Sequence, residues 1–137
     1  MPTSTRHAVY FENAVGRITE HPEGYAFVLY HDVPRQLVEL RALLTHLGQL
    51  LLRRRWHRIL VDMHRIQPLT ELEKAMLAKE WYGGGIARPE RVCTAFMMAK
   101  DAVARLSVHE VQAEAHKRND SNAFKTLEEA RAYLLSC

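Results

Sequence analysis

The spacing of apolar residues changes once along this chain, and that change restricts the fold more than any other feature. Before residue 33 the apolar residues alternate with others or form short runs, whereas from Leu37 to Leu51 leucines recur at intervals of three and four. Alternation is typical of strands, and three-four spacing is typical of a helix with one buried stripe. A chain with both patterns has to pack helices against a sheet.

Three strands are predicted in the first part of the chain, over residues 7–15, 16–22 and 24–32. The segment GYAFVLYHD is apolar at both alternating sets of positions, so we expect its strand to be covered on both faces of the sheet. Residues 21–24, HPEG, contain the Pro and Gly of a turn. They predict a hairpin between the second and third strands.

The leucine-rich segment is the strongest predicted helix. Pro34 suits its first turn and Asp32 can cap it. Arg53, Arg54 and Arg55 follow in its last turn, where positive charge suits the helix dipole.

Strands and helices then alternate along the chain. RILVDM (58–63) and RVCTAFMMA (91–99) are short buried-strand runs, and NAF (122–124) indicates a short final strand. Helix starts are predicted by three pairs with the spacing of a capping box: Thr70 with Glu73, Ser107 with Glu110, and Thr126 with Glu129. The last helix carries Leu127, Ala130 and Leu134 on one face. This order predicts an α/β domain, on the border of α+β, with parallel pairing between consecutive strands.

Length and composition favour one globular domain over residues 1–137. The apolar fraction is 47%, and the net charge of +3 is smaller than most nucleic-acid binders need on one face. Two cysteines do not make a disulfide framework, and a terminal cysteine such as Cys137 is a poor staple. No segment is apolar enough for a signal peptide or a membrane span. We therefore expect a reducing, cytoplasmic compartment.

Gly83, Gly84 and Gly85 raise the question of a phosphate-binding loop. Such a loop lies between a strand and the following helix, whereas these glycines follow a helix and precede a strand. They predict the end of a helix or, alternatively, a hinge beside a groove.

Other candidate sites have a plain structural interpretation. The basic run RRRWHR (53–58) could contact phosphate groups, or its charges could simply be solvated at the end of a helix. His31-Asp32 and Asp62-x-His64 are suggestive pairs at strand exits, where α/β proteins form sites. No spacing predicts a metal, a cofactor or a catalytic nucleophile. We predict a protein that is not an enzyme.

The segment VDMHRIQPLTELEKAML (61–77) and the closing AFKTLEEARAYLL (123–135), with the strand order, resemble the SpoIIAA-like or STAS superfamily. Within it the chain is similar to small stand-alone bacterial STAS/SEC14 domain proteins. The resemblance implies a mixed sheet of four to five strands with helices mainly on one face. It also implies a signalling module that docks a protein partner and is switched by phosphorylation at a helix start.

On that resemblance the acceptor position falls at Thr70, although the family's Asp-Ser-Gly signature is absent. The corresponding partner surface comprises His64, Arg65, Thr70 and Glu71. Exposed aromatic anchors such as Trp81 and Tyr82 would supply docking energy, unless they belong to the core.

The SEC14 side of the resemblance implies a different function, a carrier of a small apolar or lipid-like ligand. Its groove would be lined by Met76, Trp81, Tyr82, Phe96 and Met98, unless these residues simply fill the core. A weak homodimer is also plausible under either function.

Overall fold

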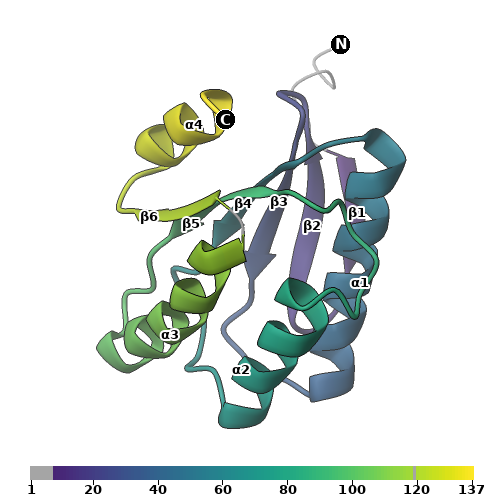
Figure 1. The fold of residues 1–137 in the computed structure, drawn as a ribbon. Coiled ribbons are helices and arrows are strands. Elements are labelled where there is room, and N and C mark those ends of the chain that lie inside the picture. Colours follow the sequence, from purple (N-terminus) through teal and green to yellow (C-terminus); the bar gives the residue numbers. More distant parts are fainter. Residues whose placement is uncertain (1–7, 119) are drawn as a thin grey trace.

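A computed structural model of the chain describes residues 8–118 and 120–137, without the side chains of residues 112, 114–118 and 120. Strands and helices alternate after an initial group of three strands (Figure 1). The strands are β1 (Ala8–Glu12), β2 (Gly16–His21), β3 (Tyr25–Tyr30), β4 (Arg58–Asp62), β5 (Cys93–Met97) and β6 (Asp120–Phe124). The helices are α1 (Leu37–Arg54), α2 (Glu71–Met76), its π-helical continuation η2 (Leu77–Tyr82), α3 (Ala102–Arg118) and α4 (Leu127–Leu135).

The strands form one mixed sheet in the order β1-β2-β3-β4-β5-β6. The pairs β1–β2 and β2–β3 are antiparallel, and the pairs from β3 to β6 are parallel. The α/β class is therefore confirmed, and the six strands correspond to the six segments that the sequence pattern predicts as strands. The four to five strands implied by the family resemblance are too few.

Helices α1, α2 and α3 cover one face of the sheet, and α4 covers part of the other (Figure 1). Each of the first three connects parallel strands that are neighbours in both sequence and space. Crossovers of one handedness between such strands place their helices on the same face. The prediction of helices mainly on one face is thus confirmed.

Two apolar clusters follow from this layering. The larger lies under α1, whose leucines from Leu40 to Leu51 supply most of its helical side, while Leu37 at the helix start is exposed. The smaller lies under α4, where Ala130 and Leu134 pack on the sheet and Leu127 remains exposed. Apolar residues on both sides of β3 are buried, so the prediction of a strand covered on both faces is confirmed.

Two of the three predicted capping boxes mark real helix starts. Thr70 caps α2, and Thr126 caps α4 by accepting a hydrogen bond from the Glu129 N–H. Ser107 instead lies inside α3 and is buried, and Asp101 accepts from the Ala104 N–H at the true start. The predicted start at Ser107 is wrong because an [ST]-x-x-E spacing also occurs within helices.

Asp32 does not cap α1. The helix begins after Gln36 without a side-chain cap, and the Asp32 carboxylate accepts from Gln67 Nε2 at 3.2 Å. The predicted cap is wrong because four residues separate Asp32 from the first helical turn. The basic last turn is confirmed, with Arg53 and Arg54 in the helix and Arg55 in the left-handed region at φ 59°.

The three glycines end the helix that α2 and η2 form together. Gly84 has φ +88°, and a Cβ on Gly85 would lie 2.6 Å from a carboxylate oxygen of Glu80. The Arg88 guanidinium holds the segment, since its Nε donates to the Trp81 carbonyl at 2.6 Å and its Nη1 donates to the Pro89 carbonyl at 2.7 Å. The prediction of a helix end is confirmed.

A disulfide joins Cys93, at the start of β5, to Cys137 beyond α4, with 6.5 Å between their Cα atoms. This pairing is contrary to the expectation from sequence, which placed no disulfide here. The reason is tertiary: α4 folds back across β5 and brings its end to the start of that strand. Within the described residues, no helix has the length and apolar content needed to cross a bilayer.

Candidate functional site

The C-terminal ends of the parallel strands and the first turns of α1, α2 and α3 meet at one edge of the molecule (the lower edge in Figure 1). This edge is where open α/β sheets form ligand sites, because the loops that follow the strands surround a crevice there. We call it the carboxyl edge. Thr70, His64 and Arg65 all lie at it, in the loop from β4 to α2.

Thr70 is exposed at the N-cap of α2 and forms a reciprocal capping box. Its Oγ1 accepts from the Glu73 N–H at 3.1 Å, and its own N–H donates to Glu73 Oε1 at 2.9 Å. The neighbouring Glu71 carboxylate is exposed and forms a salt bridge with Lys74 Nζ at 2.6 Å. The hydroxyl that the resemblance implies as a phosphorylation site is therefore accessible, beside an exposed acidic side chain.

Beneath Thr70 lies a buried ion pair that the sequence did not reveal. Arg35, in the loop from β3 to α1, donates from Nε and Nη2 to the two carboxylate oxygens of Glu73 at 2.7 and 2.9 Å. The two side chains are only 2% and 4% exposed. The same Nη2 also donates to the carbonyl oxygens of Gln67 and Pro68. Arg35 thus ties the starts of α1 and α2 together and supports the capping box from below.

The charge state of Glu73 follows from these contacts. Burial alone raises the pKa of a carboxyl group, but the hydrogen bonds from Arg35 and Thr70 outweigh it and hold the pKa of Glu73 below its ordinary value. Arg35 and Glu73 are 38 residues apart in sequence, and neither belongs to a motif with the other. No local signal identifies such a pair, because only the packing of the two loops brings them together.

An open hollow lies beside this pair, between the loops that follow β3, β4 and β5. It has two adjoining parts, with volumes of about 440 and 650 Å³, and Asp32, His64, Arg65 and Lys100 line both of them. We call this hollow the edge groove. His64 and Arg65 were expected at a functional surface, whereas Lys100 was not singled out because its segment forms no motif.

The walls of the edge groove are fixed by hydrogen bonds between its loops. The Asp62 carboxylate accepts from the His64 N–H at 3.0 Å and lies 3.2 Å from His64 Nδ1. The Lys100 N–H donates to the His64 carbonyl at 3.1 Å, which joins the loop after β4 to the loop after β5. The other suggestive pair does not form, because His31 Nε2 lies 3.0 Å from Glu12 rather than beside Asp32.

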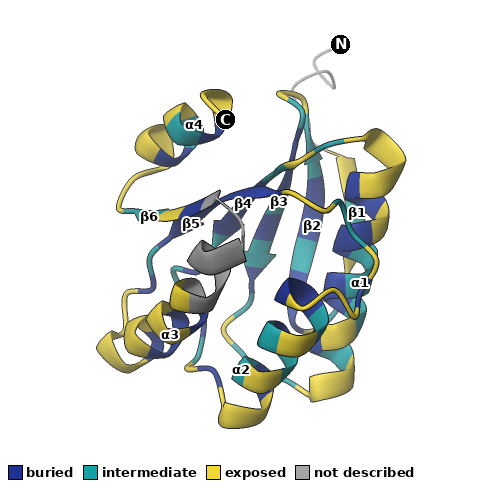
Figure 2. Ribbon diagram, in the orientation of Figure 1, coloured by how far each residue is buried: buried dark blue, intermediate teal, exposed yellow. Residues whose placement is uncertain are grey.

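Exposed apolar side chains also gather at the carboxyl edge, which is largely exposed in Figure 2. Val38 and Leu72 are each 71% exposed, on the first turns of α1 and α2. The others at this edge are Leu37, Val103 and Leu106. Among the described residues nine large apolar side chains are exposed, and these five form the largest group at one edge. We call them the edge apolar group.

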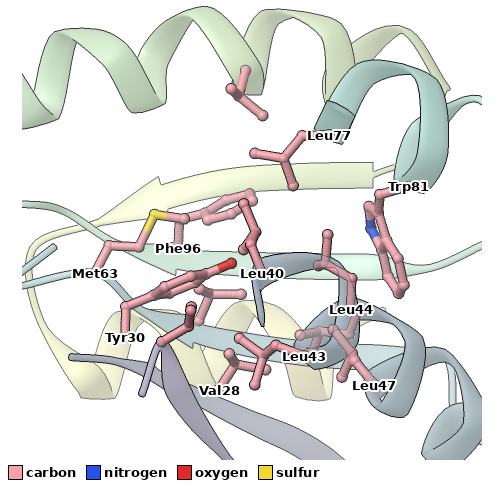
Figure 3. Close-up of a cluster of buried hydrophobic side chains, with 14 of the residues drawn as sticks. Val28, Tyr30, Leu40, Leu43, Leu44, Leu47, Met63, Leu77, Trp81 and Phe96 are labelled. Atoms are coloured by element: carbon pink, nitrogen blue, oxygen red, sulfur yellow. The ribbon is translucent and has the colours of Figure 1, made fainter. Parts of the chain in front are cut away.

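The residues proposed for a ligand groove do not all meet. Trp81, Tyr82 and Phe96 are buried and border a small cavity in the larger core cluster, part of which is drawn in Figure 3. Met76 packs at the margin of that cluster, and Met98 lies beyond the end of β5, where its N–H donates to the Phe124 carbonyl. Trp81 and Tyr82 are therefore core residues rather than exposed anchors.

The core cavity is too small for a lipid-like ligand as it stands. Its volume is about 40 Å³, whereas pockets for drug-sized ligands measure about 300–1,000 Å³. Two tyrosines line it, and burial raises the pKa of Tyr30 to about 12 and raises that of Tyr82 as well. Both phenols therefore stay neutral near neutral pH, and the cavity is a weakly polar part of the core.

Two arginines of the basic run have partners in neighbouring segments. In the basic run, Arg54 Nε donates to Glu20 at 2.7 Å and its guanidinium lies 5.9 Å from the centroid of the Trp56 ring. Arg58 donates to the Cys137 carbonyl. No group of three or more metal-ligating side chains occurs within the part of the chain that the structure describes.

Comparison with known proteins adds no identification. No family model matches the sequence, and no curated protein matches it either. Function has to be argued from the carboxyl edge itself.

Proposed function

We propose that this protein is a regulatory interaction module, without a catalytic role of its own, that binds a protein partner through its carboxyl edge. The observation that carries the proposal is the edge apolar group, which lies at the same edge of the molecule as the exposed Thr70. Exposed apolar side chains that gather in one place mark interaction surfaces more often than scattered ones do. Leu72 and Val103 are the natural anchors, because they project from helix starts held in place by packing beneath them.

Rigidity of the surface supports the same proposal. The Arg35–Glu73 pair and the capping box hold the first turn of α2, and Leu69 N–H donates to the buried Ser107 hydroxyl at 3.0 Å, which ties the same loop to α3. A surface that is ordered before binding loses less conformational entropy when the partner docks.

In this proposal Thr70 is the position at which phosphorylation regulates docking. A phosphoryl group there would place about two negative charges at the start of α2, next to Glu71 and two residues from Leu72. The added charge would oppose an apolar partner surface and would compete with Glu73 for the backbone N–H groups. The intact mass of the protein from its native host tests this step, since a phosphoryl group mapped to another residue, or absent under all growth conditions, counts against it.

The docking proposal is tested by quantitative copurification from the native host with charge-bearing variants. Leu72→Glu and Val103→Glu place a charge in the edge apolar group, and Leu52→Glu places the same charge at the far end of α1, where Leu52 is 47% exposed. We expect one partner to be retained by the wild type and by Leu52→Glu and lost from the other two variants. Equal recovery with all four proteins would rule out this surface.

The same experiment identifies a homodimer if the retained partner is a second copy of the chain. Molar mass in solution, measured by light scattering on the purified protein, then has to fall from dimer to monomer in Leu72→Glu and stay unchanged in Leu52→Glu. A monomeric wild type excludes the homodimer and leaves a different protein as the partner.

A further inference from the structure

We propose that the edge groove binds a small molecule that carries both a phosphate group and hydroxyl groups, such as a sugar phosphate. This inference does not depend on the proposed protein partner, because it rests on the charged side chains of the hollow, although Val103 of the edge apolar group also lines it. Each part of the hollow has a volume within the range of small-ligand pockets, and the location outside the ends of parallel strands is the usual one for α/β proteins.

Two cations at the groove are available to an anion. Arg65 and Lys100 both line both parts of the hollow, and neither side chain has an ion pair or hydrogen bond with another residue in the described ranges. The carboxylates nearby already receive donors from elsewhere: Asp62 from His64, and Asp101 from the Ala104 N–H. A phosphate between Arg65 and Lys100 would supply the partner that both cations lack, through charge-assisted hydrogen bonds.

The backbone holds these cations in a shared frame. The Lys100 N–H bonds to the His64 carbonyl, and the Met63 N–H bonds to the Met97 carbonyl at 3.1 Å, so the loops after β4 and β5 are joined twice. The helix α3 begins two residues after Lys100, and the positive end of its dipole favours an anion close to Lys100. Little reorganisation of the backbone is therefore needed for binding.

The carboxylates determine what else the ligand has to contain. Asp32 and Asp62 line the same hollow, and a carboxylate has more acceptor sites than the one or two donors that each receives here. Such oxygens accept hydrogen bonds from ligand hydroxyl groups and repel a second anionic group. The mixture of free cations and carboxylates therefore favours a hydroxylated phosphate over inorganic phosphate alone.

The test is a nuclear magnetic resonance titration of the purified full chain with ribose 5-phosphate, inorganic phosphate and ribose in separate experiments. We expect ribose 5-phosphate to give saturable shifts of the amide signals of His64, Arg65 and Lys100, with inorganic phosphate binding at least about tenfold more weakly. No saturable shift with ribose 5-phosphate at millimolar concentration would overturn the proposal. Equal affinity for inorganic phosphate would overturn the role assigned to the carboxylates.

Charge variants show whether the two cations are responsible. Lys100→Met and Arg65→Met should each weaken binding of ribose 5-phosphate about tenfold or more, since a hydrogen bond between charged groups contributes on that scale. Arg53→Met removes the same charge from the last turn of α1, at the opposite end of that helix, and should leave the affinity unchanged. An equal loss in Arg53→Met would mean that net charge alone attracts the ligand, which would overturn the proposal.

A carboxylate variant separates binding of the phosphate group by the cations from binding of the hydroxyl groups by the carboxylates. Asp32→Asn should weaken the binding of ribose 5-phosphate but not the binding of inorganic phosphate, because only the sugar hydroxyl groups donate to that carboxylate. Loss of both ligands to the same extent would contradict the assignment. Circular dichroism confirms that each variant is folded, and a failed partner search would leave these measurements unaffected because they use the purified protein alone.

Discussion

Replacing Glu73 with Gln should destabilise the protein far more than the same replacement at an exposed glutamate with similar hydrogen bonds. The change keeps the size of the side chain but removes the negative charge from a site that is 4% exposed, beside a guanidinium that is 2% exposed. Three hydrogen bonds converge on the carboxylate, two from Arg35 and one from the Thr70 N–H. Breaking a buried ion pair in this way leaves an uncompensated charge and costs about 3–5 kcal/mol.

Urea unfolding followed by tryptophan fluorescence measures this loss, since Trp81 is buried in the larger core cluster. The matched control is Glu23→Gln, which removes a carboxylate that Arg131 holds equally well by geometry, at 2.9 and 2.6 Å, but on the surface. We expect little change in that control, because exposed pairs contribute little. Similar urea midpoints for Glu73→Gln and Glu23→Gln would refute the claim that burial of the pair matters.

A double variant separates the pair from its surroundings. Arg35→Met with Glu73→Leu replaces both charges by apolar side chains, and it should be less destabilised than the sum of the two single variants. Additive effects would mean that the two residues act independently.

The pH dependence gives a further check on the same pair. The pKa of Glu73 is lowered in the folded protein, so its contribution is fully present above the unfolded value near 4.5. That contribution is lost as the pH falls through the folded value, and the difference in stability between wild type and Glu73→Gln should shrink in that range. A difference that stays constant down to pH 3 would contradict the role of the charge.

Three other substitutions test the core and the chain crossings. Leu44→Ala removes a buried side chain that borders the core cavity and should cost about 2–5 kcal/mol in urea unfolding; a neutral result would mean that α1 is not core. Gly48→Ala places a methyl group against the Ala87 carbonyl and should cost about 1–3 kcal/mol, and unchanged stability would mean that this close approach is absent. Cys137→Ser removes a disulfide between residues 44 apart in sequence and should lower the free energy of unfolding by about 4 kcal/mol by the loop-entropy relation. If a reducing agent leaves the urea midpoint of the wild type unchanged, that result contradicts the disulfide.

Local patterns in the sequence were sufficient for most of the secondary structure. The three-four leucine spacing located α1, and the capping box at Thr70 located α2 to the residue, because both signals act within a few residues of the chain. The same kind of pattern misplaced the start of α3 at Ser107, whose hydroxyl serves a distant backbone group, the Leu69 N–H. A short motif does not reveal which of its polar groups form hydrogen bonds with another segment of the chain.

The candidate site was only half visible in the sequence. His64, Arg65 and Thr70 follow one another in a single loop, and their position after a buried strand was enough to mark them as a surface of interest. Their partners come from elsewhere in the chain: Arg35 from the loop after β3, and Lys100 from the loop after β5.

What the sequence determined by itself was the α/β class, the order of its strands and helices, and the helix ends that depend on adjacent residues. The tertiary structure alone decided the buried Arg35–Glu73 pair, the Cys93–Cys137 disulfide and the mixture of charges in the edge groove. The physical reason is distance along the chain. Propensity, periodicity and capping are interactions between neighbours, whereas these features join residues 30 or more apart, whose meeting depends on how the sheet orders its strands.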